Sequence, residues 1–356
     1  MTPIKNAPAT SPPLSVLLVG QDNLFAEIGG CAVDHVPTGR TFTPAGAATR
    51  LRWRAWPRIF ARLAAAKYDL IVLPAIDFGW SHDASRCKRI LRSAAARLLR
   101  FRPISAALNG LLSRRNTQVI VLDRYDAHDT LLDFLRSLTC ASFYFKTNLR
   151  ETDHERQLAV GHNAGCRFKF LPYWVASDRY SISPPPEKDI DLFFAGAVNS
   201  EERRAALAEV RKLEPEGVRV RIVEGRLPFP EYLDLMSRSW LTLSPQGYGY
   251  NGFRHYESML VGSIPVINRS EPPIMHDFVP GENCFLYAPG ASDLNQTIRR
   301  ALANKLQLQT MAQGLREFVL ERHSLAGVGR YLLRTTFGDS PHLPRATAAL
   351  TAGVLS

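Results

Sequence analysis

Short apolar runs alternate with amphipathic stretches along the first half of the chain. The apolar runs, which we interpret as strands, begin at Leu14, Tyr68, Thr117, Ala141 and Arg167. The amphipathic stretches, which we interpret as helices, cover about 56–67 and 129–137. A strand that is apolar throughout is covered on both faces, as in a parallel sheet. The pattern predicts a doubly wound α/β domain over residues 14–180.

The same alternation restarts after a proline-rich stretch. Residues 181–188, within Ser177–Lys188, contain three consecutive prolines that neither pair in sheets nor continue helices, and predict an interdomain linker. Beyond it, apolar runs predict strands at 189–194, 218–223, 240–243, 263–267 and 283–287. Helices are expected at 201–212 (capped by Asn199 or Ser200), 230–239, 255–261, 293–304 and 306–323. A second α/β domain over residues 189–340 is therefore expected.

The two ends of the chain and its composition change this picture little. Residues 1–13 predict a disordered leader, and residues 341–356, rich in Ala and Thr, predict a loose tail. A length of 356 residues suits two domains of roughly 150 residues each. The five cysteines are scattered and have no C-x-x-C spacing, which argues against a disulfide framework or a zinc site. Without any run of 18 apolar residues, a cytoplasmic protein is expected.

The net charge of +11 is concentrated in residues 86–115, where nine Arg or Lys occur without an acidic residue. Apolar residues at helical spacing give this segment one apolar face and a cationic remainder. Such a helix either touches an anionic membrane surface or is an outer helix whose arginines face water. Nucleic acid is not expected as a partner, because no nucleic-acid motif accompanies the charge.

Candidate chemistry is concentrated in Trp240–Asn268. A predicted strand ends at Ser244-Pro245, and the loop that follows interleaves glycines with aromatic residues. Arg254 and Glu257 then share one face of a short helix, which Gly262 ends. A helix N-terminus and an arginine attract phosphate, and a carboxylate one turn further on suits a pair of hydroxyls. The alternative is an ordinary surface pair on a helix packed against a sheet.

The segment F-R-H-Y-E-S-M-L-V-G-S-I-P-V-I resembles R-x-x-E-x-x-x-x-G-x-x-P-V-I of GT-B glycosyltransferases, especially the bacterial family-1-like and exostosin-like members. The resemblance implies two Rossmann-like doubly wound domains facing a cleft, with the terminal helix returning to the N-terminal domain. By resemblance, Glu257 binds the ribose and Arg254 the diphosphate of a nucleotide-sugar donor, without a metal or a cofactor. Retaining members with a Glu-x7-Glu pair carry a second Glu at the position of Gly249, so an inverting reaction is expected here.

The residues predicted to bind the donor are Gly196, Arg226, Gly247, Tyr248, Gly249, Tyr250, Asn251, Gly252, Arg254 and Glu257. Glycines allow close approach of the backbone to the ligand, and the aromatic rings are available for stacking. For Gly196 and Arg226 the alternatives are a plain tight turn and a surface arginine.

The base that deprotonates the acceptor is expected from the N-terminal domain. Asp123, Asp126 and His128 place three proton-transfer groups after one strand, at the edge where ligands collect. The alternative is a helix N-cap made by Asp126 or Asp129. Asp22 and Asp77 are rivals by position, and His276-Asp277 could contact the sugar.

The sequence thus predicts a metal-independent glycosyltransferase that moves a sugar from a nucleotide-sugar to a hydroxyl of a glycan, lipid-linked or cell-surface polysaccharide acceptor. Two alternatives stay open. One is a nucleotide-sugar epimerase or hydrolase on the same fold, which would release free sugar or a 2-epimer without acceptor. The other is a catalytically inactive nucleotide-sugar or carbohydrate-binding protein, which would bind the donor without turnover.

Overall fold

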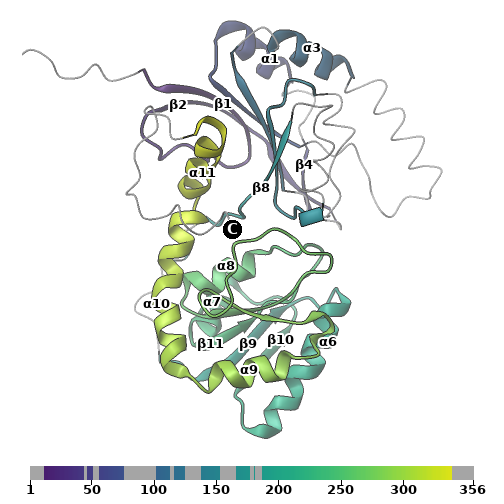
Figure 1. Cartoon of the computed structure of the whole chain (residues 1–356), viewed down its shortest axis with the longest axis vertical. Coiled ribbons are helices and arrows are strands. Elements are labelled where there is room, and N and C mark those ends of the chain that lie inside the picture. Colours follow the sequence, from purple (N-terminus) through teal and green to yellow (C-terminus); the bar gives the residue numbers. More distant parts are fainter. Residues whose placement is uncertain are drawn as a thin grey trace, which may run out of the picture.

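The computed structural model describes residues 12–43, 46–50, 56–75, 102–112, 116–124, 138–152, 166–176, 180 and 187–338. Within these residues the protein has two parallel sheets flanked by helices, one in each half of the chain (Figure 1). The predicted α/β class with two Rossmann-like domains is confirmed.

The N-terminal sheet has six parallel strands. Their spatial order is β2 (Cys31–Pro37), β1 (Leu14–Gly20), β5 (Leu70–Pro74), β6 (Gln118–Asp123), β7 (Phe143–Lys146) and β8 (Arg167–Phe170). A separate antiparallel pair is formed by β3 (Gly39–Thr43) and β4 (Gly46–Arg50). The strands β2, β3 and β4 were not predicted from the sequence. The other five fall where the apolar runs predicted them.

Helices cover both faces of this sheet. Along β1, Leu17 and Val19 pack with α1 (Trp56–Ala65) and α3 (Arg102–Leu112). The alternate residues, Val16 and Leu18, pack with α11 (Leu325–Phe337) on the other face. This division follows from the two-residue period of a strand. Burial on both faces explains why the strands are apolar throughout.

The C-terminal sheet has five parallel strands. Their spatial order is β10 (Val220–Glu224), β9 (Ile190–Gly196), β11 (Ser239–Leu243), β12 (Ile264–Asn268) and β13 (Phe285–Tyr287). The helices are α6 (Glu201–Val210), α7 (Phe229–Ser237), α8 (Phe253–Leu260), α9 (Leu294–Leu302) and α10 (Lys305–Arg322), with short 3-10 turns η4 (Arg211–Glu216) and η5 (Pro289–Ala291). All of these strands and α helices were predicted to within a few residues. Ser200 is the predicted cap of α6, since its hydroxyl accepts a bond from the Arg203 N–H at 3.2 Å.

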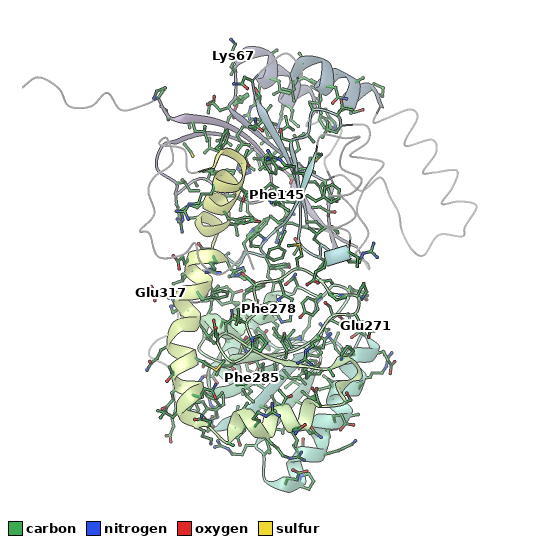
Figure 2. The ribbon with its side chains drawn as sticks, in the orientation of Figure 1. Lys67, Phe145, Glu271, Phe278, Phe285 and Glu317 are labelled. Atoms are coloured by element: carbon green, nitrogen blue, oxygen red, sulfur yellow. The ribbon has the colours of Figure 1, made fainter. Side chains whose placement is uncertain are left out.

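The chain returns to the N-terminal domain through its last helix. Figure 1 shows α10 running along the C-terminal domain and α11 lying beside the N-terminal sheet. The Tyr331 hydroxyl of α11 donates to the Phe170 carbonyl at 2.8 Å. Gly329 lies so close to Leu24 that a Cβ at position 329 would overlap the Leu24 carbonyl oxygen. In Figure 2, Phe145 lies among the side chains of the N-terminal sheet and Phe278 among those of the C-terminal domain.

Direct hydrogen bonds join the two domains. The Met275 N–H donates to the Leu149 carbonyl at 2.8 Å, and the Asn251 N–H donates to Asn148 Oδ1 at 3.0 Å. Among the described residues, no helix is both long and apolar enough to cross a membrane. The predicted leader (1–13), apart from residues 12 and 13, the helix at 129–137, most of the linker and basic segment, and the tail lie outside the described residues.

Candidate functional site

The order of strands in the C-terminal sheet defines where a ligand is expected. The first strand of this domain, β9, lies between the second, β10, and the third, β11, so the direction of the connections reverses between β9 and β11. Ligands of open α/β sheets bind outside the carboxyl ends of the strands at such a switch point. Here those ends are Gly196 on β9 and the loop 244–252 after β11. The predicted glycine-rich loop therefore lies at the expected place.

Arg254, on the first turn of α8, reaches the end of the neighbouring strand β9. Its Nη2 donates to the Ala195 carbonyl at 2.7 Å, and its guanidinium carbon lies 4.9 Å from the centre of the Phe194 ring. A Cβ at Gly196 would overlap the same Nη2 atom. The fold thus brings together Gly196 and Arg254, two of the residues predicted to bind the donor.

Arg203 makes the reciprocal contact, and sequence reasoning missed it. It lies on α6 after β9 and reaches the loop after β11, where its Nε donates to the Pro245 carbonyl at 3.4 Å. A Cβ at Gly247 would stand 2.7 Å from Arg203 Nη2. Its Nη1 donates to the Ala197 carbonyl at 2.7 Å and to Asn199 Oδ1 at 2.9 Å. Arg203, on the helix after β9, therefore contacts the loop after β11, and Arg254, on the helix after β11, contacts the end of β9.

Two positive charges consequently meet at the switch point. Within the described part of the chain, neither guanidinium has a carboxylate in ion-pair contact, and Arg254 Nε is buried without a partner. Burial, together with the charge of Arg254, lowers the pKa of Arg203 to about 10. Two like charges held close together create a site that is stabilised by an anion.

The loop between β11 and α8 exposes Tyr248 and buries Tyr250 and Asn251. Tyr248 is 60% exposed, whereas Tyr250 is 1% exposed. The amide of Asn251 donates to the Thr147 carbonyl at 2.9 Å and accepts from the Tyr256 hydroxyl at 3.2 Å. Asn251 therefore joins the two domains. Contact of Tyr248, Gly249, Tyr250 or Asn251 with a donor stays a prediction.

Glu257 lies one turn beyond Arg254, as the spacing predicted. Its two carboxylate oxygens accept hydrogen bonds from Tyr180 at 2.9 Å and Tyr232 at 2.8 Å. Burial raises the pKa of this carboxyl group, although the two hydroxyl bonds and the charge of Arg254 act in the opposite direction. The sequence did not indicate either tyrosine, because both are distant from Glu257 along the chain.

Gly252 and Arg226 stand at the margins of the site. Gly252 is the N-cap of α8 with extended backbone (φ −142°), and a Cβ there would meet nothing within 4 Å. Arg226 is exposed and follows Gly225, whose N–H donates to the Gly196 carbonyl at 3.1 Å. Arg226 therefore lies beside the Gly196 turn, and its contact with a donor stays a prediction.

The predicted base candidates at the N-terminal edge have different surroundings. Asp123, at the end of β6, is 1% exposed and accepts bonds from the Tyr144 hydroxyl and from Lys146 Nζ, the latter at 3.1 Å. Its carboxylate belongs to a buried ion pair. Asp77, Asp126 and His128 lie outside the described residues.

Asp22 occupies the equivalent switch point of the N-terminal sheet, after β1. Its side chain is 24% exposed and accepts bonds from Trp174 Nε1 at 3.0 Å and Arg124 Nη1 at 3.3 Å. The Arg124 guanidinium carbon lies 5.5 Å from the centre of the Tyr173 ring, which contacts the Phe253 ring at a centroid distance of 4.7 Å. Since Phe253 precedes Arg254, Asp22 is on the side of its domain that faces the first turn of α8.

His276 and Asp277 lie in the joint between the domains. Asp277 Oδ2 lies 2.7 Å from His323 Nε2, and the other ring nitrogen of His323 lies 2.7 Å from the Tyr173 carbonyl oxygen. His276 Nδ1 accepts from the Phe278 N–H at 3.2 Å. Asp277 is thus engaged in a contact that ties α10 to both domains, and contact of this pair with a sugar stays a prediction.

Comparisons with known proteins agree with this fold. Residues 200–334 match the family model described as Glycosyl transferase-like. A glycosyltransferase from Rickettsia africae ESF-5 is similar with a TM-score of 0.53, 9% identity, and coverage of 93% of this chain and 100% of that chain. The apo form of the lipopolysaccharide outer core galactosyltransferase WaaB has a TM-score of 0.51, 13% identity, and coverage of 92% and 100%.

A third solved structure, Anabaena HepE in complex with UDP, has a TM-score of 0.47 and 15% identity, with coverage of 90% of this chain and 99% of that chain. The comparison with curated protein sequences gave no match. The protein therefore has the GT-B fold. The match to the glycosyltransferase family model lies within its C-terminal half.

Proposed function

We propose that the enzyme transfers a sugar from a nucleotide-sugar donor to a hydroxyl group of a glycan, a lipid-linked or a cell-surface polysaccharide acceptor. The observation that carries the proposal is the pair Arg203 and Arg254 at the switch point. Both guanidinium groups lie at backbone turns where only glycine leaves room for them. A diphosphate bound there receives charge-assisted hydrogen bonds and neutralises two like charges. We propose that Glu257 binds the ribose of the same donor.

The arginines also suit the chemistry of transfer. The departing nucleoside diphosphate gains negative charge as the glycosidic bond breaks, and fixed cations stabilise that charge in the transition state. We therefore propose a reaction that needs no metal ion. Because Gly249 stands where retaining relatives carry a second Glu, we propose that the reaction inverts the anomeric centre.

The base belongs to the opposite edge, in the N-terminal domain. Of the two described carboxylates at that edge, Asp22 has a side chain that is 24% exposed, whereas Asp123 is 1% exposed and paired with Lys146. A base must reach the hydroxyl that it deprotonates. The greater solvent exposure of its side chain therefore favours Asp22 over Asp123 as the base. Asp126 and His128 stay predictions, as does membrane contact through residues 86–115.

The test is a thermal-shift and calorimetric screen against UDP, GDP, CMP and dTDP sugars, with and without EDTA. A ligand at one hundred times its Kd should stabilise the protein by about 2.7 kcal/mol. Arg203→Ala or Arg254→Ala should each weaken the binding that is found by about ten- to one-hundred-fold.

Arg204→Ala is the matched control, since Arg204 is the next residue of α6 and forms an exposed pair with Glu201. It should leave binding unchanged. Equal affinity of both test variants and the wild type would overturn the proposal. Donor binding with no transfer to any acceptor would favour the catalytically inactive binding protein instead.

A further inference from the structure

The carboxylate of Glu257 is held by two phenol hydroxyls, one on each oxygen. Tyr180 donates to Oε1 at 2.9 Å and Tyr232 donates to Oε2 at 2.8 Å. The two tyrosines come from different parts of the chain. Tyr232 belongs to α7, and Tyr180 lies in the segment between the domains. The carboxylate plane is therefore fixed from two directions.

Both phenols are themselves held by packing. The ring centroid of Tyr232 lies 6.0 Å from that of Phe193 and 6.3 Å from that of Phe229. Tyr180 contacts Phe229 edge-on, with a centroid distance of 5.7 Å. Fixed rings keep their hydroxyls in place without further ordering when a ligand arrives.

The arrangement leaves acceptor capacity on Glu257. Each oxygen of an ionised carboxylate has about two lone pairs, and here the tyrosines use one on each. Two acceptor positions therefore remain, one per oxygen, which matches the two neighbouring hydroxyls of a ribose. The hydroxyl bonds also favour the ionised form, because burial raises the pKa of Glu257 and the bonds oppose this.

We propose that Tyr180 and Tyr232 are positioning residues that make the donor site select ribose over deoxyribose. They do so by orienting Glu257 and favouring its ionised form, not by touching the ribose. The inference rests on the proposed function, since it takes Glu257 as the ribose-binding group. Because Tyr180 lies between the two domains, a residue outside the C-terminal domain contributes to the preference for ribose.

The experiment compares Kd by calorimetry for a nucleoside diphosphate and its 2′-deoxy form. The probes are UDP and 2′-deoxyUDP, or GDP and 2′-deoxyGDP if the guanine nucleotide is the one that binds. The wild type should bind the ribose form about ten-fold more tightly. Tyr180→Phe and Tyr232→Phe should each weaken the ribose form by about five- to ten-fold and the deoxy form by less than about two-fold. Loss of affinity equal for both forms would overturn the inference, because it would show a merely structural role.

A pH series adds a second readout. Binding to the ionised carboxylate is present above the pKa of Glu257 and is lost as pH falls through it. Removal of a phenol raises that pKa, so the pH midpoint for ribose binding should move upward in both variants. A midpoint equal to that of the wild type contradicts the inference.

Tyr331→Phe is the matched control, because it removes a partly buried hydroxyl bond of 2.8 Å to Phe170 in the N-terminal domain. It should change neither the ratio of affinities nor the midpoint.

Glu257→Gln distinguishes the ribose-binding role of Glu257 from the positioning role of the two tyrosines. If it leaves the ribose preference intact, the ribose assignment in the proposed function fails. If it abolishes the preference while the tyrosine variants keep it, only the present inference fails.

Discussion

The guanidinium of Arg254 lies against the backbone of Gly196, and it does so at a position where a Cβ would overlap it. Gly196 also has a backbone φ of +153°, which side-chain-bearing residues rarely adopt. Arg203 and Gly247 repeat the relationship across the same pair of strands, at 2.7 Å from the Cβ position to Nη2. The observed positions of the two guanidinium groups therefore require glycine at 196 and at 247.

A first prediction follows for Gly247→Ala. The added methyl group must push the Arg203 guanidinium aside, and a flexible side chain can move at little cost in stability. We expect the free energy of unfolding to change by less than about 1 kcal/mol, while donor affinity falls by about ten-fold. Calorimetric titration and urea unfolding of the same preparations measure both quantities.

Gly252→Ala is the control for that substitution. Its backbone is extended, and a Cβ there meets nothing within 4 Å, so both affinity and stability should stay near wild type. An unchanged donor affinity in Gly247→Ala would show that Arg203 does not bind the donor from the position that it occupies here.

A second prediction distinguishes Asp22 from Asp123. If Asp22 is the base, Asp22→Asn should lower kcat by about one-hundred-fold or more and leave donor affinity unchanged. Asp123→Asn should instead destabilise the fold, by about 3–5 kcal/mol, because it leaves Lys146 buried without its carboxylate. Steady-state kinetics and thermal unfolding of the two variants are the measurements. A stable Asp123→Asn variant without activity, beside an active Asp22→Asn variant, would assign the base to Asp123.

A third prediction concerns the joint between the domains. Both ring nitrogens of His323 face oxygens, the Tyr173 carbonyl and Asp277 Oδ2, each at 2.7 Å. Burial alone would raise the pKa of Asp277, but the charge and hydrogen bond of His323 outweigh it and hold this pKa below its ordinary value. Asp277→Asn breaks this buried pair and should cost about 3–5 kcal/mol at pH 7.

The dependence on pH has a definite sign. A carboxyl group whose pKa is lower in the folded state stabilises the fold above its unfolded value of about 3.9, and loses that contribution as pH falls through the folded pKa. The difference in unfolding free energy between wild type and Asp277→Asn should therefore shrink below about pH 4. Asp234→Asn, which removes an exposed pair with Arg238, serves as control and should cost less than about 1 kcal/mol. A difference that is constant from pH 7 to pH 3 would contradict the ion pair.

Much of the C-terminal domain could be predicted because its signals are local. The apolar runs fix the strands, and the glycine-rich loop and the Arg254–Glu257 spacing lie within one segment of the chain. Arg203 carries no such signal, since its contact with Gly247 exists only after β9 and β11 have paired. The partners of Glu257 likewise meet it only through the fold.

The elements that were missed have weak or interrupted local patterns. The strand β2, with sequence CAVDHVP, places Asp34 and His35 within an apolar run. The helix α11 contains Gly327 and Gly329, which lower helix propensity by about 1 kcal/mol each relative to Ala. Packing explains both glycines, because a Cβ at Gly327 would overlap the Glu321 carbonyl and one at Gly329 would overlap Leu24. Tertiary contacts therefore stabilise this helix although its two glycines lower its intrinsic helix propensity.

The most direct test of the account is a crystal structure of the protein with the nucleoside diphosphate that the binding screen identifies. The account predicts that the diphosphate lies between the carboxyl ends of β9 and β11, within hydrogen-bond distance of both Arg203 and Arg254, with the ribose hydroxyls on Glu257. A diphosphate bound away from both arginines, at a concentration that saturates binding in solution, would contradict it.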